Sequence, residues 1–99
     1  MKLQMQSVHF DADKKLLDFI QKKMDKLDTF YDKIIDGDVI LRLDNDDQKG
    51  NKVVNLKINI PGTVLIAKEN AETFEEAVDE GVENLKNQLK KTKEKIMGR

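Results

Sequence analysis

The chain contains no cysteine and only one histidine among its 99 residues. Disulfide bonds, thiolate metal sites, cysteine nucleophiles and clusters of histidine ligands are therefore excluded. Small secreted domains of this size usually depend on disulfides for their stability. The composition therefore favours a cytoplasmic location, and we expect neither a metal site nor a cofactor.

Linker segments and long hydrophobic runs are absent as well. The chain has no run of 18 apolar residues, and residues 1–6 lack the apolar stretch of a signal peptide, so no membrane segment is predicted. One proline and five glycines are not gathered into a linker. A chain of this length buries roughly 60 to 70% of its unfolded surface. We expect residues 1–99 to form one domain with a modest core and no deep cleft for a small-molecule substrate.

Hydrophobic periodicity in the first half predicts a strand, a helix and a second strand. Residues 2–8 alternate between apolar and polar side chains, as in a half-buried strand. Asp13 is the predicted N-cap of a helix beginning at Lys14. The apolar stripe of this helix recurs every three or four residues at Leu16, Leu17, Ile20, Met24, Leu27 and Tyr31. Asp36-Gly37-Asp38 predicts a turn, and a second strand then places Val39, Leu41 and Leu43 on one face.

The second half predicts two more strands and a long helix. Residues 45–51 predict a hairpin loop, and the third strand places Val54, Leu56, Ile58 and Ile60 on one face. Pro61-Gly62 predicts a tight turn into a fourth strand over Val64 to Lys68, so the last three strands should form an antiparallel meander. Thr73 and Glu76 predict a capping box for a helix that runs to about Ile96. Its apolar face is Phe74, Val78, Val82, Leu85, Leu89 and Ile96.

The resulting order is β-α-β-β-β-α. Two amphipathic helices packed on one face of a four-stranded sheet would bury every apolar stripe. The expected fold class is therefore α+β.

Catalytic and calcium-binding patterns fail on spacing. Ser7, His9 and Asp11 alternate on a strand, which separates them by roughly 6.6 to 6.8 Å, whereas a nucleophile and its base require contact at about 2.6 to 3.2 Å. In the acidic stretch that starts at Asp44, the glycine and the final ligand do not fall at the positions a calcium loop requires. We expect no catalytic residue and no enzyme activity.

Charge is distributed unevenly along the last predicted helix, although the net charge is only -1. Residues 69–83 hold seven acidic side chains and no basic one, whereas residues 84–99 hold six basic side chains against Glu94 alone. The helix dipole favours this order but acts only within the first and last turns. The basic segment spans about nine residues, or roughly 14 Å of helix. The dipole therefore explains only part of the pattern, and charge alone is compatible with a phosphate-binding surface or with a merely solvated helix face.

Lysines of both predicted helices contribute to that surface. Lys86, Lys90 and Lys93 flank one side of the apolar stripe, and Lys91 and Lys95 flank the other. The first helix adds further lysines, diluted by four aspartates at positions 18, 25, 28 and 32. Because both helices pack on the same face of the sheet, we expect their lysines to line one groove. The candidate phosphate-binding residues are Lys22, Lys23, Lys26, Lys86, Lys90, Lys91, Lys93 and Lys95.

Several motifs at matching mutual spacing resemble one protein family over the whole chain. They are Lys26-Leu27, Phe30-Tyr31-Asp32-Lys33, the strand Val39 to Leu43, the Pro61-Gly62 hairpin, Phe74 to Asp79 and Gln88 to Lys95. The chain resembles the short ribosome hibernation-promoting factors, the family that includes protein Y.

The resemblance implies a domain like those that bind double-stranded RNA, located in the channel of the small ribosomal subunit that messenger and transfer RNA normally occupy. It also implies inhibition of translation under stress and a monomer when free. Lys23, Lys26, Lys91, Lys93 and Lys95 stand where the family usually has basic residues. Asn84 and Asn87 depart from this pattern, because those positions are often basic.

Other functions stay open at the level of sequence. A protein-protein module could use the acidic residues 69–83 to meet a basic partner, such as a transcription factor that it modulates. A binder of free double-stranded RNA is a further alternative.

Overall fold

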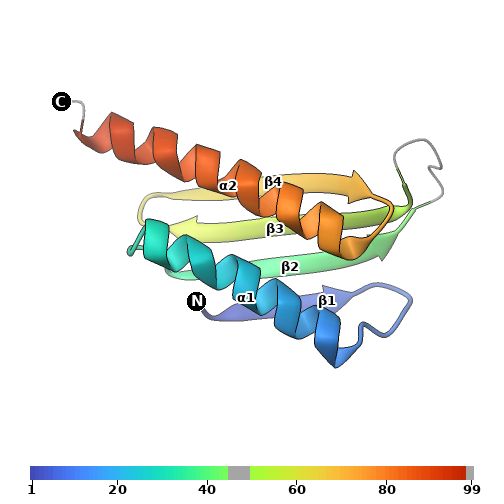
Figure 1. The fold of residues 1–99 in the computed structure, drawn as a ribbon. Helices are drawn as coiled ribbons and strands as arrows, with labels where there is room; N and C mark the ends of the chain where they lie inside the picture. Colours follow the sequence, from blue (N-terminus) through green and yellow to red (C-terminus); the bar gives the residue numbers. More distant parts are fainter. Residues whose placement is uncertain (45–49, 98–99) are drawn as a thin grey trace.

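The computed structural model describes residues 1–44 and 50–97, with only the backbone of Ile96 and Met97. Its elements are β1 (Leu3–Ser7), α1 (Lys14–Phe30), β2 (Asp36–Leu43), β3 (Lys52–Ile60), β4 (Thr63–Ala71) and α2 (Phe74–Met97). Both helices lie on the same face of the sheet, and α2 projects beyond it at its carboxyl end (Figure 1). The predicted α+β fold class is confirmed. The predicted loop over residues 45–51 lies mostly outside the described residues.

The four strands form one sheet in the order β1-β2-β3-β4. β1 pairs with β2 in parallel, and this arrangement requires a crossover, which α1 provides. β2, β3 and β4 pair antiparallel, so the predicted meander is confirmed. Gly62 has a φ of 86° in the turn between β3 and β4, a left-handed conformation that glycine adopts without strain.

Two predicted strand boundaries were wrong. Asp36-Gly37-Asp38 belongs to β2, where Gly37 pairs with Leu3 of β1 and with Ile58 of β3. A Cβ at Gly37 would lie 2.8 Å from a Leu3 side-chain atom, so glycine serves close packing here rather than a turn. β4 extends three residues beyond Lys68, because its last residues continue to pair with β3 as far as Ala71.

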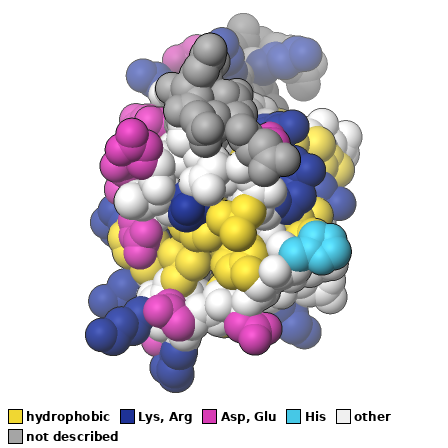
Figure 2. All heavy atoms as spheres, turned by 90° about the vertical axis from the view of Figure 1, so that its right-hand side faces the viewer, with side chains coloured by type: hydrophobic (Ala, Val, Ile, Leu, Met, Phe, Trp, Pro, Cys, Tyr) yellow, Lys and Arg dark blue, Asp and Glu magenta, His cyan; other side chains and the backbone are white. Residues whose placement is uncertain are grey.

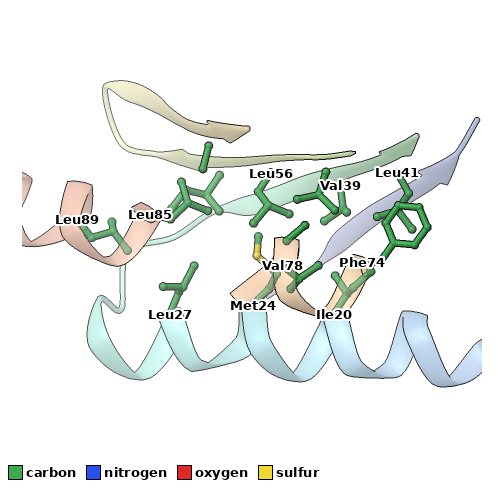
Figure 3. Packing of buried hydrophobic residues seen from close by; sticks show 14 of the residues in the cluster. Ile20, Met24, Leu27, Val39, Leu41, Leu56, Phe74, Val78, Leu85 and Leu89 are labelled. Atoms are coloured by element: carbon green, nitrogen blue, oxygen red, sulfur yellow. The ribbon is translucent and has the colours of Figure 1, made fainter. Parts of the chain in front are cut away.

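The core fills the space between the helices and the sheet. Ile20, Met24 and Leu27 point from α1 toward the sheet, and Leu56 and Val39 point back from it (Figure 3). The α2 side of the same core is formed by Phe74, Val78, Leu85 and Leu89. Fully burying such a side chain stabilises the fold by about 1.5 to 3 kcal/mol. Leu43 departs from its predicted inward position and is 50% exposed at the last position of β2.

Side chains cap both helices at their predicted starts. The backbone N–H of Leu16 donates to Asp13 Oδ1 over 2.9 Å, and the N–H of Glu76 donates to Thr73 Oγ1 over 3.1 Å. The position predicted for the Ile96 side chain lies outside the described side chains. Within the described residues, no group of His, Asp or Glu is arranged to hold a metal ion, and neither helix is long and apolar enough to cross a membrane.

Candidate nucleic-acid interface

The two helices lie side by side and run in the same direction (Figure 1). Lys23 Nζ of α1 lies 3.0 Å from Asp79 Oδ1 of α2. Further along both helices, the Phe30 ring lies near the ammonium groups of Lys86 and Lys93. We call the facing flanks of α1 and α2, together with the outward sides of the helices that adjoin these flanks, the helix-pair surface. Its lysines are Lys22, Lys23, Lys26, Lys86, Lys90 and Lys93.

Helical spacing places three α1 lysines on this surface. Lys23 contacts α2 directly, and Lys26 lies one turn further along, between Lys23 and Phe30. Lys22 lies one turn before Lys26 and is exposed, as Lys26 is. Lys22 and Lys26 are one turn apart and both exposed, an arrangement suited to backbone phosphates.

Phe30 organises the α2 lysines of the helix-pair surface. The centroid of its ring lies 4.7 Å from Lys93 Nζ and 5.6 Å from Lys86 Nζ, within the range of cation-π attraction. Lys93 Nζ also donates a hydrogen bond of 3.2 Å to the backbone oxygen of Phe30, at the last residue of α1. Lys90 lies one turn from both lysines and is exposed.

Lys91 and Lys95 lie on the other flank of α2. Gln88 marks that flank, because its side-chain amide donates to the backbone oxygen of Ile66 in β4 over 2.9 Å. Lys91 and Lys95 follow Gln88 by three and seven residues, and are therefore on the side of β4 rather than of α1. The structure brings six of the eight candidate lysines together and separates these two.

Most of the aspartates near the α1 lysines form ion pairs with groups outside the helix-pair surface. The amino group of Met1 donates to Asp25 Oδ1 over 2.7 Å and also to Asp28. These hydrogen bonds raise the pKa of the amino group above its usual value. Asp18 pairs with Lys14 at 2.9 Å. Among the described residues, the ion pairs leave Lys22, Lys26, Lys86, Lys90 and Lys93 available to an external anion.

The pKa of Asp25 reflects its contact with Met1. Burial disfavours the charged carboxylate, but hydrogen bonds from the Met1 amino group and from Gln21 Nε2 outweigh this effect and lower the pKa below its usual value. Asp25 is thus held as an anion on the side of α1 that faces the amino terminus.

Acidic side chains limit the helix-pair surface toward the start of the helices. Asp79 neutralises Lys23, and Glu83 lies one turn further along the same flank. Figure 2 views the end where both helices begin, and the described part of this end mixes acidic and basic side chains around a hydrophobic centre. The cationic part of the surface therefore lies toward the carboxyl ends of the helices.

Sequence reasoning missed the role of Phe30. Aromatic residues are expected to pack in the core, and Phe30 is only partly buried. A similar contact occurs within α1, where Lys23 Nζ lies 5.4 Å from the centroid of the Phe19 ring. Sequence could have predicted this contact, because residues four apart on one helix are neighbours. No local signal predicts Phe30 against Lys93, because 63 residues separate them in the sequence.

Comparisons with known proteins agree with this architecture. A ribosome hibernation promoting factor of Pseudomonas putida is 30% identical over 95 residues, which cover 96% of this chain and 89% of the relative. A ribosome hibernation promotion factor of Deinococcus radiodurans is 25% identical, and the match covers 95% of this chain but only 50% of that protein.

Solved structures show the same fold. A ribosomal subunit interface protein from Coxiella burnetii superposes with a TM-score of 0.82 at 25% identity, covering 94% of this chain and 98% of that one. The N-terminal domain of Thermus thermophilus Protein Y superposes with a TM-score of 0.79 at 22% identity, covering 93% and 99%. The family described as Sigma 54 modulation protein / S30EA ribosomal protein matches residues 3–97, and the chain belongs to this family.

Proposed function

We propose that the protein is a ribosome hibernation factor. In this proposal residues 1–99 form a single ribosome-binding domain, which binds the RNA of the small subunit in the channel for messenger and transfer RNA. Occupying that channel inhibits translation under stress or in stationary phase. The protein acts in the cytoplasm, is a monomer when free and catalyses no reaction.

One observation carries the proposal: lysines from two helices far apart in the sequence meet on the helix-pair surface. Five of its six lysines form no ion pair within the described part of the chain. Phosphate contacts depend on such local cationic surfaces rather than on net charge, and each contact releases a counterion. The names of the relatives point to the ribosome as the source of the phosphates.

The two helices present a rigid spacing of charges. Phe30 and its backbone oxygen fix the ammonium group of Lys93, so less conformational freedom is lost when that group meets a phosphate. Lys91 and Lys95 extend the cationic surface around the other flank of α2. We propose phosphate contacts for all eight lysines, with the stronger contribution from the helix-pair surface.

Asn84 replaces a position that is often basic in the family, and its side chain has a structural contact here. Asn84 Nδ2 donates to a Glu69 carboxylate oxygen over 3.2 Å, and its Oδ1 accepts from Gln88 over 2.9 Å. The β4 flank of α2 is therefore used for contact with the sheet at this position. Lys86 and Lys90 on the opposite flank supply the charge.

Sedimentation with purified ribosomal subunits tests the proposal. The protein should co-sediment with the small subunit through a sucrose gradient and should inhibit translation in a purified system. Messenger RNA bound beforehand should reduce the co-sedimentation if the two compete for one channel. A protein that stays at the top of the gradient would contradict the proposal.

The alternative function, modulation of a transcription factor, has support in the exposed acidic side chains of Glu75, Glu76, Glu80 and Glu83 at the start of α2. The family description also names a sigma 54 modulation protein. Recovery of a protein partner that survives nuclease treatment, together with failure to bind the small subunit, would favour this alternative.

A further inference from the structure

The face of the sheet opposite the helices contains a hollow of about 870 Å³. Its volume lies within the range of roughly 300 to 1,000 Å³ that is common for ligand-binding clefts. The hollow lies on the other side of the sheet from the helix-pair surface. An inference drawn from it is therefore independent of the proposed function.

Two neighbouring rows of side chains, each crossing all four strands, line the hollow. Paired positions in the first row are Gln6, Ile40, Asn55 and Lys68. Paired positions in the second row are Gln4, Asp38, Lys57 and Ile66. Because strands lie about 4.8 Å apart, each row spans about 14 Å, the length of four to five extended residues.

The hollow combines apolar anchors with groups that match a peptide backbone. Ile40 and Ile66 lie in adjacent rows, and Ile66 is 59% exposed although it is a large aliphatic residue. Glutamine and asparagine side chains both donate and accept hydrogen bonds, as peptide groups do. The exposed side chains of Gln4 and Gln6 in β1 offer such groups to an incoming backbone.

Charge in the two rows favours an acidic occupant. Lys57 and Lys68 outnumber Asp38, whose carboxylate lies 3.7 Å from Lys57 Nζ in an exposed ion pair. Such exposed pairs are weak, so Lys57 can exchange one carboxylate for another. Lys68 belongs to no ion pair within the described residues.

A nucleic acid fits this face less well than a polypeptide. Neither row contains an aromatic side chain on which a base could stack. Aliphatic anchors, amide groups and excess lysines together match an extended peptide with both aliphatic and acidic side chains.

We propose that this hollow is a docking site for an extended segment of a partner protein that alternates aliphatic and acidic residues. One aliphatic side chain of the segment packs against Ile40 and another against Ile66. Its carboxylates pair with Lys57 and Lys68, and its backbone meets the amide side chains. The helices remain free to bind RNA at the same time.

Titration of the ¹⁵N-labelled protein with synthetic peptides, followed by NMR, tests the proposal. The probe is a capped hexapeptide that alternates isoleucine and glutamate. We expect its chemical-shift changes to be confined to the strands around Ile40, Asn55 and Ile66. A peptide with lysine in place of glutamate should bind at least about tenfold more weakly. No shift changes, or shifts confined to the helices, would overturn the proposal.

Two substitutions on β4 form a matched pair for the same titration. Ile66→Glu removes an anchor from the hollow and adds a repelling charge, and should weaken peptide binding by about tenfold or more. Val64→Glu makes the same kind of change on the same strand and face, but Val64 does not line the hollow. It should change binding by less than about twofold. Equal losses in both variants, or binding of a six-nucleotide uridylate to the same strands, would overturn the proposal.

Discussion

Adjacent lysines on α2 face different surroundings. Lys90 lies on the flank that faces α1, whereas Lys91 lies on the flank of β4, because successive helical residues are rotated by about 100°. The two side chains are both exposed and carry the same charge. Substituting one or the other therefore tests whether binding depends on where a lysine lies on α2 or only on the total charge.

Paired charge reversals should rank the two flanks. Each phosphate contact contributes about sixfold to affinity at 0.1 M salt if the salt slope is 0.7 to 0.9 per contact. Lys26→Glu with Lys90→Glu should weaken small-subunit binding by about 40-fold or more. Lys91→Glu with Lys95→Glu should also weaken binding, by a smaller factor, and both variants should keep the parent circular dichroism spectrum. A larger loss from the β4 flank would contradict this ranking.

Asp25 should make the stability of the fold depend on pH on the acid side. Its lowered pKa means that the folded protein binds this proton less readily than the unfolded chain, so the stability it contributes is present above the unfolded pKa. That contribution is lost as pH falls through the folded pKa. Asp25→Asn should therefore destabilise the protein most near neutral pH and progressively less in acid. Urea unfolding at several pH values measures this, and a loss that is independent of pH would argue against it.

Glycines at two element boundaries have similar backbone angles but different neighbours. Gly50 precedes β3 with a φ of 96°, and Gly62 joins β3 to β4 with a φ of 86°. A Cβ at Gly50 would lie 2.2 Å from the backbone carbon of Ala71, whereas a Cβ at Gly62 would meet no atom within 4 Å. Of the two glycines, therefore, only Gly50 is needed for close packing, because its lack of a side chain lets the start of β3 lie against the end of β4.

Alanine substitutions should separate backbone strain from close packing. Gly62→Ala should cost about 1 to 2 kcal/mol, the usual cost of a left-handed conformation for a residue with a Cβ. Gly50→Ala should cost more, by at least about 1 kcal/mol, because backbone atoms must also move apart. Equilibrium denaturation of both variants gives the difference. Equal losses would show that the contact with Ala71 contributes nothing.

Local patterns predicted most elements, because alternation and helical spacing reflect which face is buried. Leu56 and Ile58 in β3, and Met24 and Leu27 in α1, are in the core as predicted. Gly37 was wrongly placed in a turn, because its role comes from pairing with β1, more than 30 residues earlier in the chain. Local turn preference was overridden by a tertiary contact.

The candidate site was less predictable than the fold. Spacing within α2 alone separated Lys91 and Lys95 from Lys86, Lys90 and Lys93. The ion pair of Lys23 with Asp79 and the contacts of Phe30 with α2 join distant segments, and no local pattern contains them. These contacts decide which lysines remain free for phosphates.

At the scale of the whole molecule, the sheet separates two different surfaces. The helix side presents lysines from α1 and α2, and the opposite side presents the hollow, which Ile40 and Asn55 help to line. Net charge is near zero, so under the proposed function long-range attraction to RNA would come from the local cationic surface. The proposed RNA contacts use one side of the sheet and leave the other side accessible.

The dependence of small-subunit affinity on salt tests the central claim most directly. If about six of the eight lysines contact phosphates, log affinity should fall against log salt with a slope of about -4 to -5. Lys26→Met with Lys90→Met should reduce the magnitude of that slope by about 1.4 to 1.8, because two contacts are lost. A flat salt response of the parent protein, or an unchanged slope in the double variant, would contradict the account.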